Sequence, residues 1–121
     1  MASPFIYAEL HSNDVQRARE FYARLFDWKI TELPVPGKYY AEIGPGEGFP
    51  GGLTAALPEH EKFTGWLSYV KVKDLTAATE QARKLGATVV REDVQVPNEG
   101  RFSWIVDPAG APLGLWEPIA R

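Results

Sequence analysis

Apolar and polar side chains alternate near the start of the chain, a pattern typical of a strand whose faces meet different surroundings. Over residues 5–11 the two predicted faces carry Ile6, Ala8 and Leu10 on one side, and Tyr7, Glu9 and His11 on the other. Asp14 follows as a candidate N-cap, and apolar residues at helical spacing then predict a helix up to Leu25. The opening segment therefore predicts a strand followed by a capped helix.

The same pattern recurs sixty positions later, because residues 65–90 repeat the character of residues 5–30 and Asp74 falls where Asp14 stood. Such a long period indicates a duplicated module. The first copy also predicts strands over 28–33, 39–44 and 52–57. The second predicts a strand over 66–72, a helix capped by Asp74, strands over 87–91, 101–106 and 112–116, and a loop over 93–100. We therefore expect a single domain, 1–121, with β-α-β-β-β modules at 5–57 and 65–117 and a linker at 58–64.

Composition narrows the classes of protein that fit. The chain has 121 residues, of which 45% are hydrophobic and 24% charged, and its net charge of −3 does not favour a nucleic-acid partner. No apolar run approaches the roughly 20 residues that span a membrane. The absence of cysteine excludes disulfides and thiolate chemistry. We see no signal-peptide pattern at the N-terminus, and a cytoplasmic location is the expectation.

Three features carry a family resemblance: the Asp14 helix ending in Phe21-Tyr22, the equivalent Asp74 helix, and the turn Asp107-Pro108-Ala109-Gly110 before the last strand. Together they resemble the vicinal oxygen chelate superfamily of glyoxalases, bleomycin-resistance proteins and dioxygenases. The segments YAELHSNDV, FYARLFDWKI, GGL and GRFSWIVDPAGAPLGLW are similar to the group described as a predicted enzyme related to lactoylglutathione lyase. The resemblance implies an α+β fold in which the two modules form a concave half-barrel sheet with helices on its convex side.

The resemblance also implies where a divalent metal would be held, namely at Tyr7, Leu67 and Gly114. None of these is a plausible ligand for a metal that must polarise a substrate, so we expect no metal cofactor. Glu9 and His11 are close enough to supply two ligands off-register, but the second module offers no third. Lys71 would repel a cation.

Glu9 is the candidate catalytic acid or base, because burial in mid-strand would suit a carboxylate to proton transfer. A pairing of Glu9 with Lys71, or a place at a wet rim, is the alternative. Glu42 is a similar case with a stronger surface interpretation, and His60 reads as a loop residue. The candidate substrate-binding residues, with the facing of Trp104 left open, are Tyr7, His11, Leu67, Tyr69, Trp104 and Trp116.

Two functions compete on this evidence. The first is a lyase- or isomerase-like enzyme that acts on a small organic molecule without the usual metal ligands. The second is a non-catalytic protein that sequesters a small molecule or antibiotic in an aromatic cleft. A scaffold domain is the third and plainest option. The tryptophans and Phe49-Pro50 would suit an interface between two copies, so a homodimer is expected.

Overall fold

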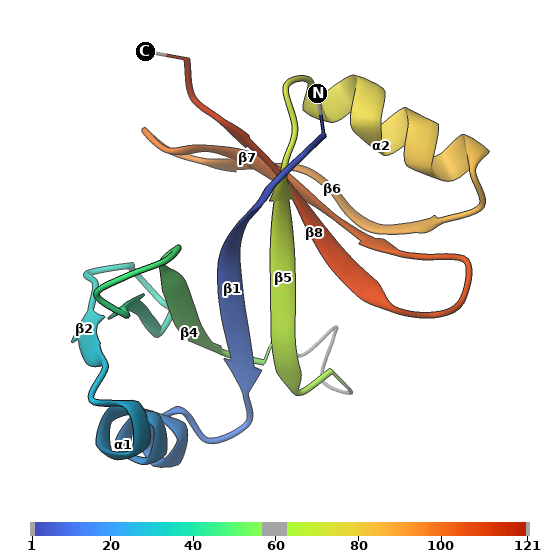
Figure 1. Ribbon diagram of the computed structural model, residues 1–121. Coiled ribbons are helices and arrows are strands. Elements are labelled where there is room, and N and C mark those ends of the chain that lie inside the picture. Colours follow the sequence, from blue (N-terminus) through green and yellow to red (C-terminus); the bar gives the residue numbers. More distant parts are fainter. Residues whose placement is uncertain (1, 57–62, 121) are drawn as a thin grey trace. The chain divides into compact units, whose positions relative to one another are not determined.

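The computed structural model describes residues 2–56 and 63–120, and the chain divides into two compact units (Figure 1). The N-terminal unit is Tyr7–Leu67, and the C-terminal unit combines Met1–Ile6 with Ser68–Arg121. The predicted end of the first module at residue 57, and His60 with most of the predicted linker, lie outside the described residues.

The N-terminal unit is built on four strands and one helix. In chain order these elements are β1 (Phe5–Ser12), α1 (Val15–Phe26), β2 (Lys29–Glu32), β3 (Tyr40–Gly44) and β4 (Gly51–Ala55). The strands lie in the order β2-β3-β4-β1. The first and last strands of the unit in chain order, β1 and β4, run parallel, and the other neighbouring pairs are antiparallel. The crossover connection that such a parallel pairing requires consists of α1, β2 and β3.

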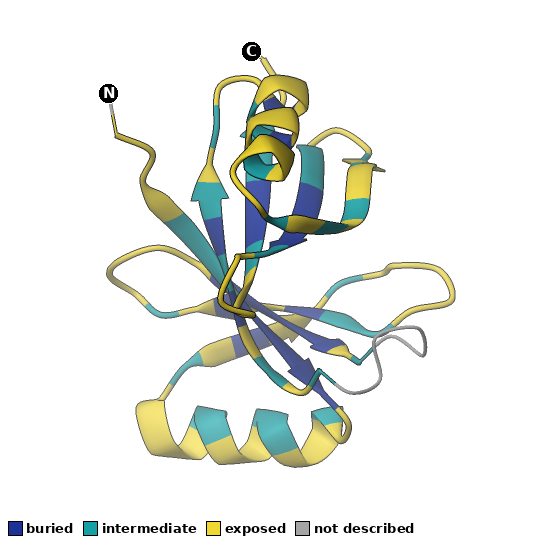
Figure 2. Ribbon diagram, turned by 90° about the vertical axis from the view of Figure 1, so that its right-hand side faces the viewer, coloured by how far each residue is buried: buried dark blue, intermediate teal, exposed yellow. Residues whose placement is uncertain are grey.

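Helix α1 begins and ends where local chemistry dictates. The Asp14 carboxylate accepts a hydrogen bond of 3.1 Å from the backbone N–H of Arg17, and Asp27 closes the helix in the left-handed conformation. The helix packs on one face of its sheet, where the buried core consists of Leu10, Ile30, Ala41, Ile43 and Leu53. No residue of α1 is itself fully buried, as Figure 2 shows. The side chains by which the helix covers this core are therefore only partly buried.

The C-terminal unit repeats the plan. Its elements are β5 (Gly65–Lys71), which begins in the N-terminal unit, α2 (Leu75–Lys84), β6 (Thr88–Val96), β7 (Gly100–Val106) and β8 (Pro112–Pro118). The strand order is β5-β8-β7-β6, with β5 and β8 parallel. Helix α2 packs against β6, β7 and β8, and its residue Leu75 forms the buried core with Ile105 and Leu115 of the strands.

The cap of α2 is reinforced from the last strand. Asp74 accepts from the N–H of Ala77 at 3.0 Å, and the Glu117 carboxylate of β8 accepts from the N–H of Leu75 at 2.7 Å. Because this N–H and the Arg101 guanidinium both donate to it, the pKa of Glu117 lies below its usual range. Gly86 has a positive φ of 101°, as predicted for the residue that ends the helix.

One element differs from its prediction. The segment 93–100 was expected to be a loop, but β6 continues to Val96 and only a short turn separates it from β7. The polar stretch fits in β6 because this strand lies at the edge of the sheet and has no buried residue. Its pairing with β7 shifts register twice, between Val89 and Arg91 and again between Arg91 and Val94. Such β-bulges leave residues unpaired, which disguises a strand as a loop in the sequence.

The predicted α+β class and its two β-α-β-β-β modules are confirmed. Most predicted strand boundaries lie within two residues of those observed, and both Asp-capped helices are present. Across residues 2–56 and 63–120, neither helix has the length and apolar character needed to cross a membrane.

Candidate functional site

A polar face lies opposite the helix-covered core of the N-terminal unit. Three neighbouring strands meet there in register, with Glu9 of β1 beside Gly52 of β4 and Gly52 beside Glu42 of β3. Since side chains alternate along a strand, Glu9 points away from the core that its neighbour Leu10 joins. The face therefore presents two carboxylates on either side of a glycine.

Glu9 is the centre of a hydrogen-bonded chain of side chains on this face. Its Oε1 lies 2.8 Å from Nε2 of His11, and its Oε2 accepts a hydrogen bond of 2.8 Å from the Tyr40 hydroxyl. The Tyr40 hydroxyl is also 2.5 Å from the hydroxyl of Tyr7. Glu9 is 8% exposed and His11 is 3% exposed. These hydrogen bonds therefore hold the largely dehydrated Glu9 carboxylate between the imidazole of His11 and the phenol of Tyr40.

Gly52 makes room for the two tyrosines. A Cβ atom at this position would lie 2.3 Å from the Tyr40 hydroxyl oxygen and 2.5 Å from that of Tyr7, both far inside van der Waals contact. The backbone of Gly52 does not have a positive φ, so conformational freedom does not explain the residue. The glycine is needed here for space, and that space lets the hydroxyls converge above the sheet.

Tyr40 stays neutral in this setting. Burial raises its pKa far above the ordinary value of 10.0, and the neighbouring Glu9 carboxylate and Tyr7 add to the rise. The phenol is therefore a hydrogen-bond donor throughout the physiological range. It donates to Glu9, which fixes one carboxylate oxygen in place.

The matching face of the C-terminal unit is aromatic. By the same register argument, Tyr69 of β5 lies beside Gly114 of β8, and Gly114 lies beside Trp104 of β7. The Trp104 indole N–H donates to the Tyr69 hydroxyl at 2.8 Å, and both side chains are buried. A Cβ atom at Gly114 would lie 2.4 Å from the Tyr69 ring, so this glycine also clears space for a tyrosine.

The structure brings some of the candidate residues together and separates others. Tyr7, Glu9 and His11 share the hydrogen-bonded chain of the N-terminal unit, and Tyr69 and Trp104 are bonded in the C-terminal unit. Leu67 is buried and offers no polar atom. Trp116 is half-buried on β8, where its ring approaches Gly100. Their roles in binding or catalysis stay predictions.

Sequence reasoning missed Tyr40, although Tyr40 and Glu42 share one face of a strand by simple alternation. The residue of this strand that was considered as a candidate is Glu42, and its side chain is exposed. The open question about Trp104 is resolved: its β7 neighbour Ile105 faces the core under α2, so Trp104 points to the other face. Glu9 contacts His11 and Tyr40 rather than lying at a wet rim.

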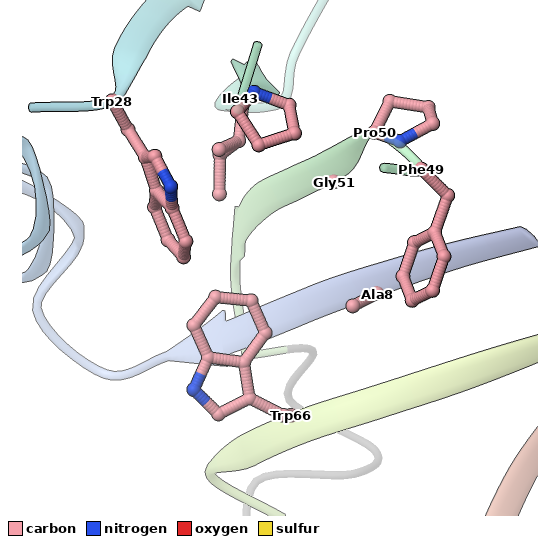
Figure 3. Close-up of a pocket in the computed structure, with 8 residues that line it drawn as sticks. Ala8, Trp28, Ile43, Phe49, Pro50, Gly51 and Trp66 are labelled. Atoms are coloured by element: carbon pink, nitrogen blue, oxygen red, sulfur yellow. The ribbon is translucent and has the colours of Figure 1, made fainter. Parts of the chain in front are cut away.

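An apolar pocket opens on the opposite, helix-covered face of the N-terminal unit (Figure 3). Small residues form its floor, because Ala8 pairs with Gly51 and Gly51 pairs with Ile43. The indole rings of Trp28 and Trp66 stand across it at 82°, with centroids 6.1 Å apart. The cavity volume is about 110 Å³, and its remaining lining residues are Pro45, Phe49 and Pro50.

The residues at the implied metal positions do not fit a metal ion. Leu67 and Gly114 have no side-chain donor atom, and the Tyr7 hydroxyl is engaged by Tyr40. Within the described parts of the chain, no three His, Cys, Asp or Glu side chains gather closely enough to hold one. The side chains at these three positions therefore do not form a metal centre.

The duplicated β-α-β-β-β plan and the glycine-floored face define a class of small α+β domain, and comparison with known proteins identifies its family. A model of the glyoxalase-like domain matches residues 8–115. The chain belongs to the glyoxalase-like domain family.

Curated relatives agree with this assignment. Two proteins named “Putative glyoxylase CFP32”, from Mycobacterium tuberculosis and Mycobacterium bovis, are each 29% identical over 92% of the chain. The chain spans 44% of the length of these relatives. A glyoxylase-like domain-containing protein of Didymella fabae is 30% identical over 84% of both chains.

Solved structures share the fold. Methylmalonyl-CoA epimerase from Mycobacterium tuberculosis matches with a TM-score of 0.70 and 23% identity over 96% of this chain and 88% of its own. A hypothetical protein from Bacillus halodurans reaches a TM-score of 0.76 at 15% identity, covering 100% of this chain and 98% of its own. A glyoxalase/bleomycin resistance protein/dioxygenase superfamily member from Vibrio splendidus has a TM-score of 0.67 at 12% identity, covering 96% and 99%.

Proposed function

We propose that the protein is a lyase- or isomerase-like enzyme that moves a proton on a small organic carbonyl compound, with Glu9 as the proton acceptor. The observation that carries the proposal is the buried Glu9 carboxylate held between His11 and Tyr40. Desolvated carboxylates held by hydrogen bonds in this way are typical of acid–base sites. A protein with a similar fold, named methylmalonyl-CoA epimerase, is by its name an enzyme of the same reaction class.

The chemistry follows from the contacts. Glu9 takes a proton from a carbon next to the carbonyl group, and the electron pair moves onto the carbonyl oxygen as an enolate. The Tyr7 hydroxyl donates its one proton to Tyr40 while the site is empty, because Tyr40 itself donates to Glu9. When the substrate binds, the Tyr7 hydroxyl turns to donate to the enolate oxygen instead. Return of the proton to the same or the adjacent carbon completes an epimerisation or isomerisation, with no oxidant or reductant. His11 orients the Glu9 carboxylate.

Exchange of substrate hydrogen with solvent tests this function directly. Methylmalonyl-CoA and the hemithioacetal of methylglyoxal serve as probes in D₂O, with deuterium incorporation followed by mass spectrometry. We expect the wild-type protein to catalyse incorporation into one of them, and Glu9→Gln to slow it by about 100-fold or more while leaving probe binding nearly unchanged.

Glu42→Gln is the matched control, because Glu42 lies on the same face and on the other side of Gly52 but is exposed. It should retain the wild-type exchange rate. Equal rates for wild type and Glu9→Gln, or a loss in Glu42→Gln as large as in Glu9→Gln, would contradict the assignment of Glu9.

A sequestering protein without catalysis is the second candidate, and the apolar pocket between Trp28 and Trp66 favours it. A lining without charged side chains suits a small hydrophobic guest. Toluene is a suitable probe, with tryptophan fluorescence as the readout. On this alternative Trp66→Ala weakens toluene binding, Glu9→Gln leaves it unchanged, and no deuterium enters either carbonyl probe.

We also propose that two copies of the chain associate. Large apolar side chains are exposed on the N-terminal unit, among them Phe26 at 51%, Phe49 at 48% and Trp66 at 39%. Burying such a patch would stabilise a dimer. Light scattering coupled to gel filtration should give twice the 13.5 kDa monomer mass, and Phe49→Asp should lower it. The cytoplasmic location stays a prediction.

A further inference from the structure

Arg91 of β6 lies against the aromatic face of the C-terminal unit. Its guanidinium carbon is 4.9 Å from the centroid of the Trp104 ring and 5.5 Å from that of Phe102. Trp104 and Phe102 pack at 5.7 Å from each other, and Tyr69 meets Phe102 edge-on at 6.1 Å. The half-buried guanidinium of Arg91 thus makes cation–π contacts with two rings, which cannot neutralise its charge.

Alternation alone would send Arg91 to the other side of the sheet. Val89 pairs with Ile105, and both belong to the core under α2. Two positions further on, an unbroken strand would point Arg91 into that same core. The register shift places one extra residue, Val90, between the two pairs, so that Arg91 pairs with Trp104 instead. The bulge reverses the facing of the arginine.

A second bulge follows at once and is held by specific contacts. Asp93 has a positive φ of 50°, and its N–H donates to the hydroxyl of the buried Ser103 at 3.2 Å. Its carboxylate pairs with Arg101 at 3.0 Å. Ser103 is in turn bonded to Thr79 of α2 at 3.0 Å. The irregular strand around Arg91 is therefore anchored to the core and is not a frayed edge.

The acidic groups near Arg91 on its own strand are engaged elsewhere. The next residue, Glu92, is paired with Arg83 of α2, and Asp93 is paired with Arg101. Over residues 2–56 and 63–120 no carboxylate lies within ion-pair distance of Arg91. The guanidinium of Arg91 therefore binds no carboxylate of the described residues, although its planar set of N–H donors suits one.

We propose that Arg91, Trp104 and Phe102 form a binding site for a small planar organic carboxylate. The guanidinium binds the carboxylate and the rings contact the flat body of the ligand. Lys or Gln would not replace Arg91, because bidentate recognition needs the planar fork. The site lies in the C-terminal unit and is independent of the proton transfer proposed for the N-terminal unit, so either proposal survives failure of the other.

Benzoate tests the site, with benzamide as the neutral control of the same shape. Titration calorimetry should show benzoate binding at least about tenfold more tightly than benzamide. Arg91→Gln should remove that preference, whereas Arg24→Gln, the same charge change at an exposed residue of α1, should keep it. In ¹H–¹⁵N spectra, benzoate should shift the indole signal of Trp104, assigned by Trp104→Phe.

Equal binding of benzoate and benzamide by the wild-type protein would overturn the proposal. Retention of the benzoate preference in folded Arg91→Gln would do the same. If thermal unfolding shows that Arg91→Gln does not fold, the Arg91→Lys variant tests the proposal instead. This variant keeps the positive charge but lacks the planar pair of N–H donors. Arg91→Lys should bind benzoate several-fold more weakly than wild type, and unchanged affinity would contradict the bidentate role.

Discussion

The two modules use one backbone plan to display opposite chemistry. Following the register across each sheet gives Glu9, Gly52, Glu42 and Thr31 in the N-terminal unit, and Tyr69, Gly114, Trp104 and Arg91 at the matching positions of the C-terminal unit. The glycine is common to both rows. The residues around it are acidic in one row and aromatic and basic in the other, so the duplication preserved space and changed what fills it.

In both units a glycine at the same position of the row leaves space for tyrosine side chains. In the first unit the vacant position receives two tyrosine hydroxyls, and in the second it receives the ring of Tyr69. A side chain at either position would occupy volume that tyrosine side chains of neighbouring strands now fill. Substitution of the glycine in each row should therefore displace different side chains.

Gly52→Ala should have the largest effect. The new Cβ atom displaces the Tyr7 and Tyr40 hydroxyls, and we expect the free energy of unfolding to fall by about 1–3 kcal/mol. Urea unfolding measures this loss. The Glu9-dependent deuterium exchange should also fall, because the substitution disrupts the hydrogen-bonded chain.

Two glycines serve as references for that result. Gly44→Ala should be tolerated, since its Cβ would meet only a backbone oxygen at 3.7 Å. Gly114→Ala should destabilise the protein as Gly52→Ala does, because of the Tyr69 ring, and should alter tryptophan fluorescence through Trp104. A Gly52→Ala variant as stable as Gly44→Ala would show that the tyrosines can move aside at no cost.

Tyr40→Phe should have an intermediate effect of about 1–2 kcal/mol, because it leaves a carboxylate oxygen of Glu9 without its donor. The pH dependence is more specific. Above the ordinary tyrosine pKa of 10.0 the unfolded chain loses the Tyr40 proton while the folded protein keeps it, so stability falls as pH rises. Below pH 10 both states are protonated and Tyr40 contributes no slope.

Urea unfolding between pH 8 and pH 11 separates the wild type from Tyr40→Phe. The wild-type protein should lose stability more steeply above pH 10, and the two curves should converge as the pH increases. Parallel curves would mean that Tyr40 ionises in the folded protein as it does in the unfolded chain.

Glu42→Gln should have the smallest effect, within about 0.5 kcal/mol, because its side chain is exposed. Thermal unfolding is a sufficient measurement. The result sharpens the comparison between the two carboxylates beside Gly52, since only Glu9 is buried and bonded. A large loss of stability in Glu42→Gln would place both carboxylates in one functional group.

Much of this fold could be predicted from local pattern. Alternation in residues 5–11 correctly separated Leu10, which joins the core, from Glu9, which faces away. The two capping aspartates marked both helices because a carboxylate beside free N–H groups has a clear physical purpose. These signals depend on neighbours in the chain, which the sequence displays directly.

The rest depended on contacts between strands. Tyr40 reaches Glu9 only because β4 lies between β3 and β1, and the sequence order does not reveal that arrangement. The role of Gly52 has no local signature, since the space it provides is filled by side chains 12 and 45 residues away. The bulges of β6 have no compositional mark, so the facing of Arg91 could not be read by counting.

The extra residue in β6 carries a consequence for how such chains diverge. Removing Val90 alone would restore plain alternation and leave Arg91 directly after Val89, still opposite Trp104. A strand that kept Val90 but lost the bulge would instead turn Arg91 toward the apolar core. Deletion of the extra residue and loss of the bulge without a deletion therefore have opposite results for the cation on this face. Residues in this family are therefore better compared by the face on which they lie than by their identity in an aligned column.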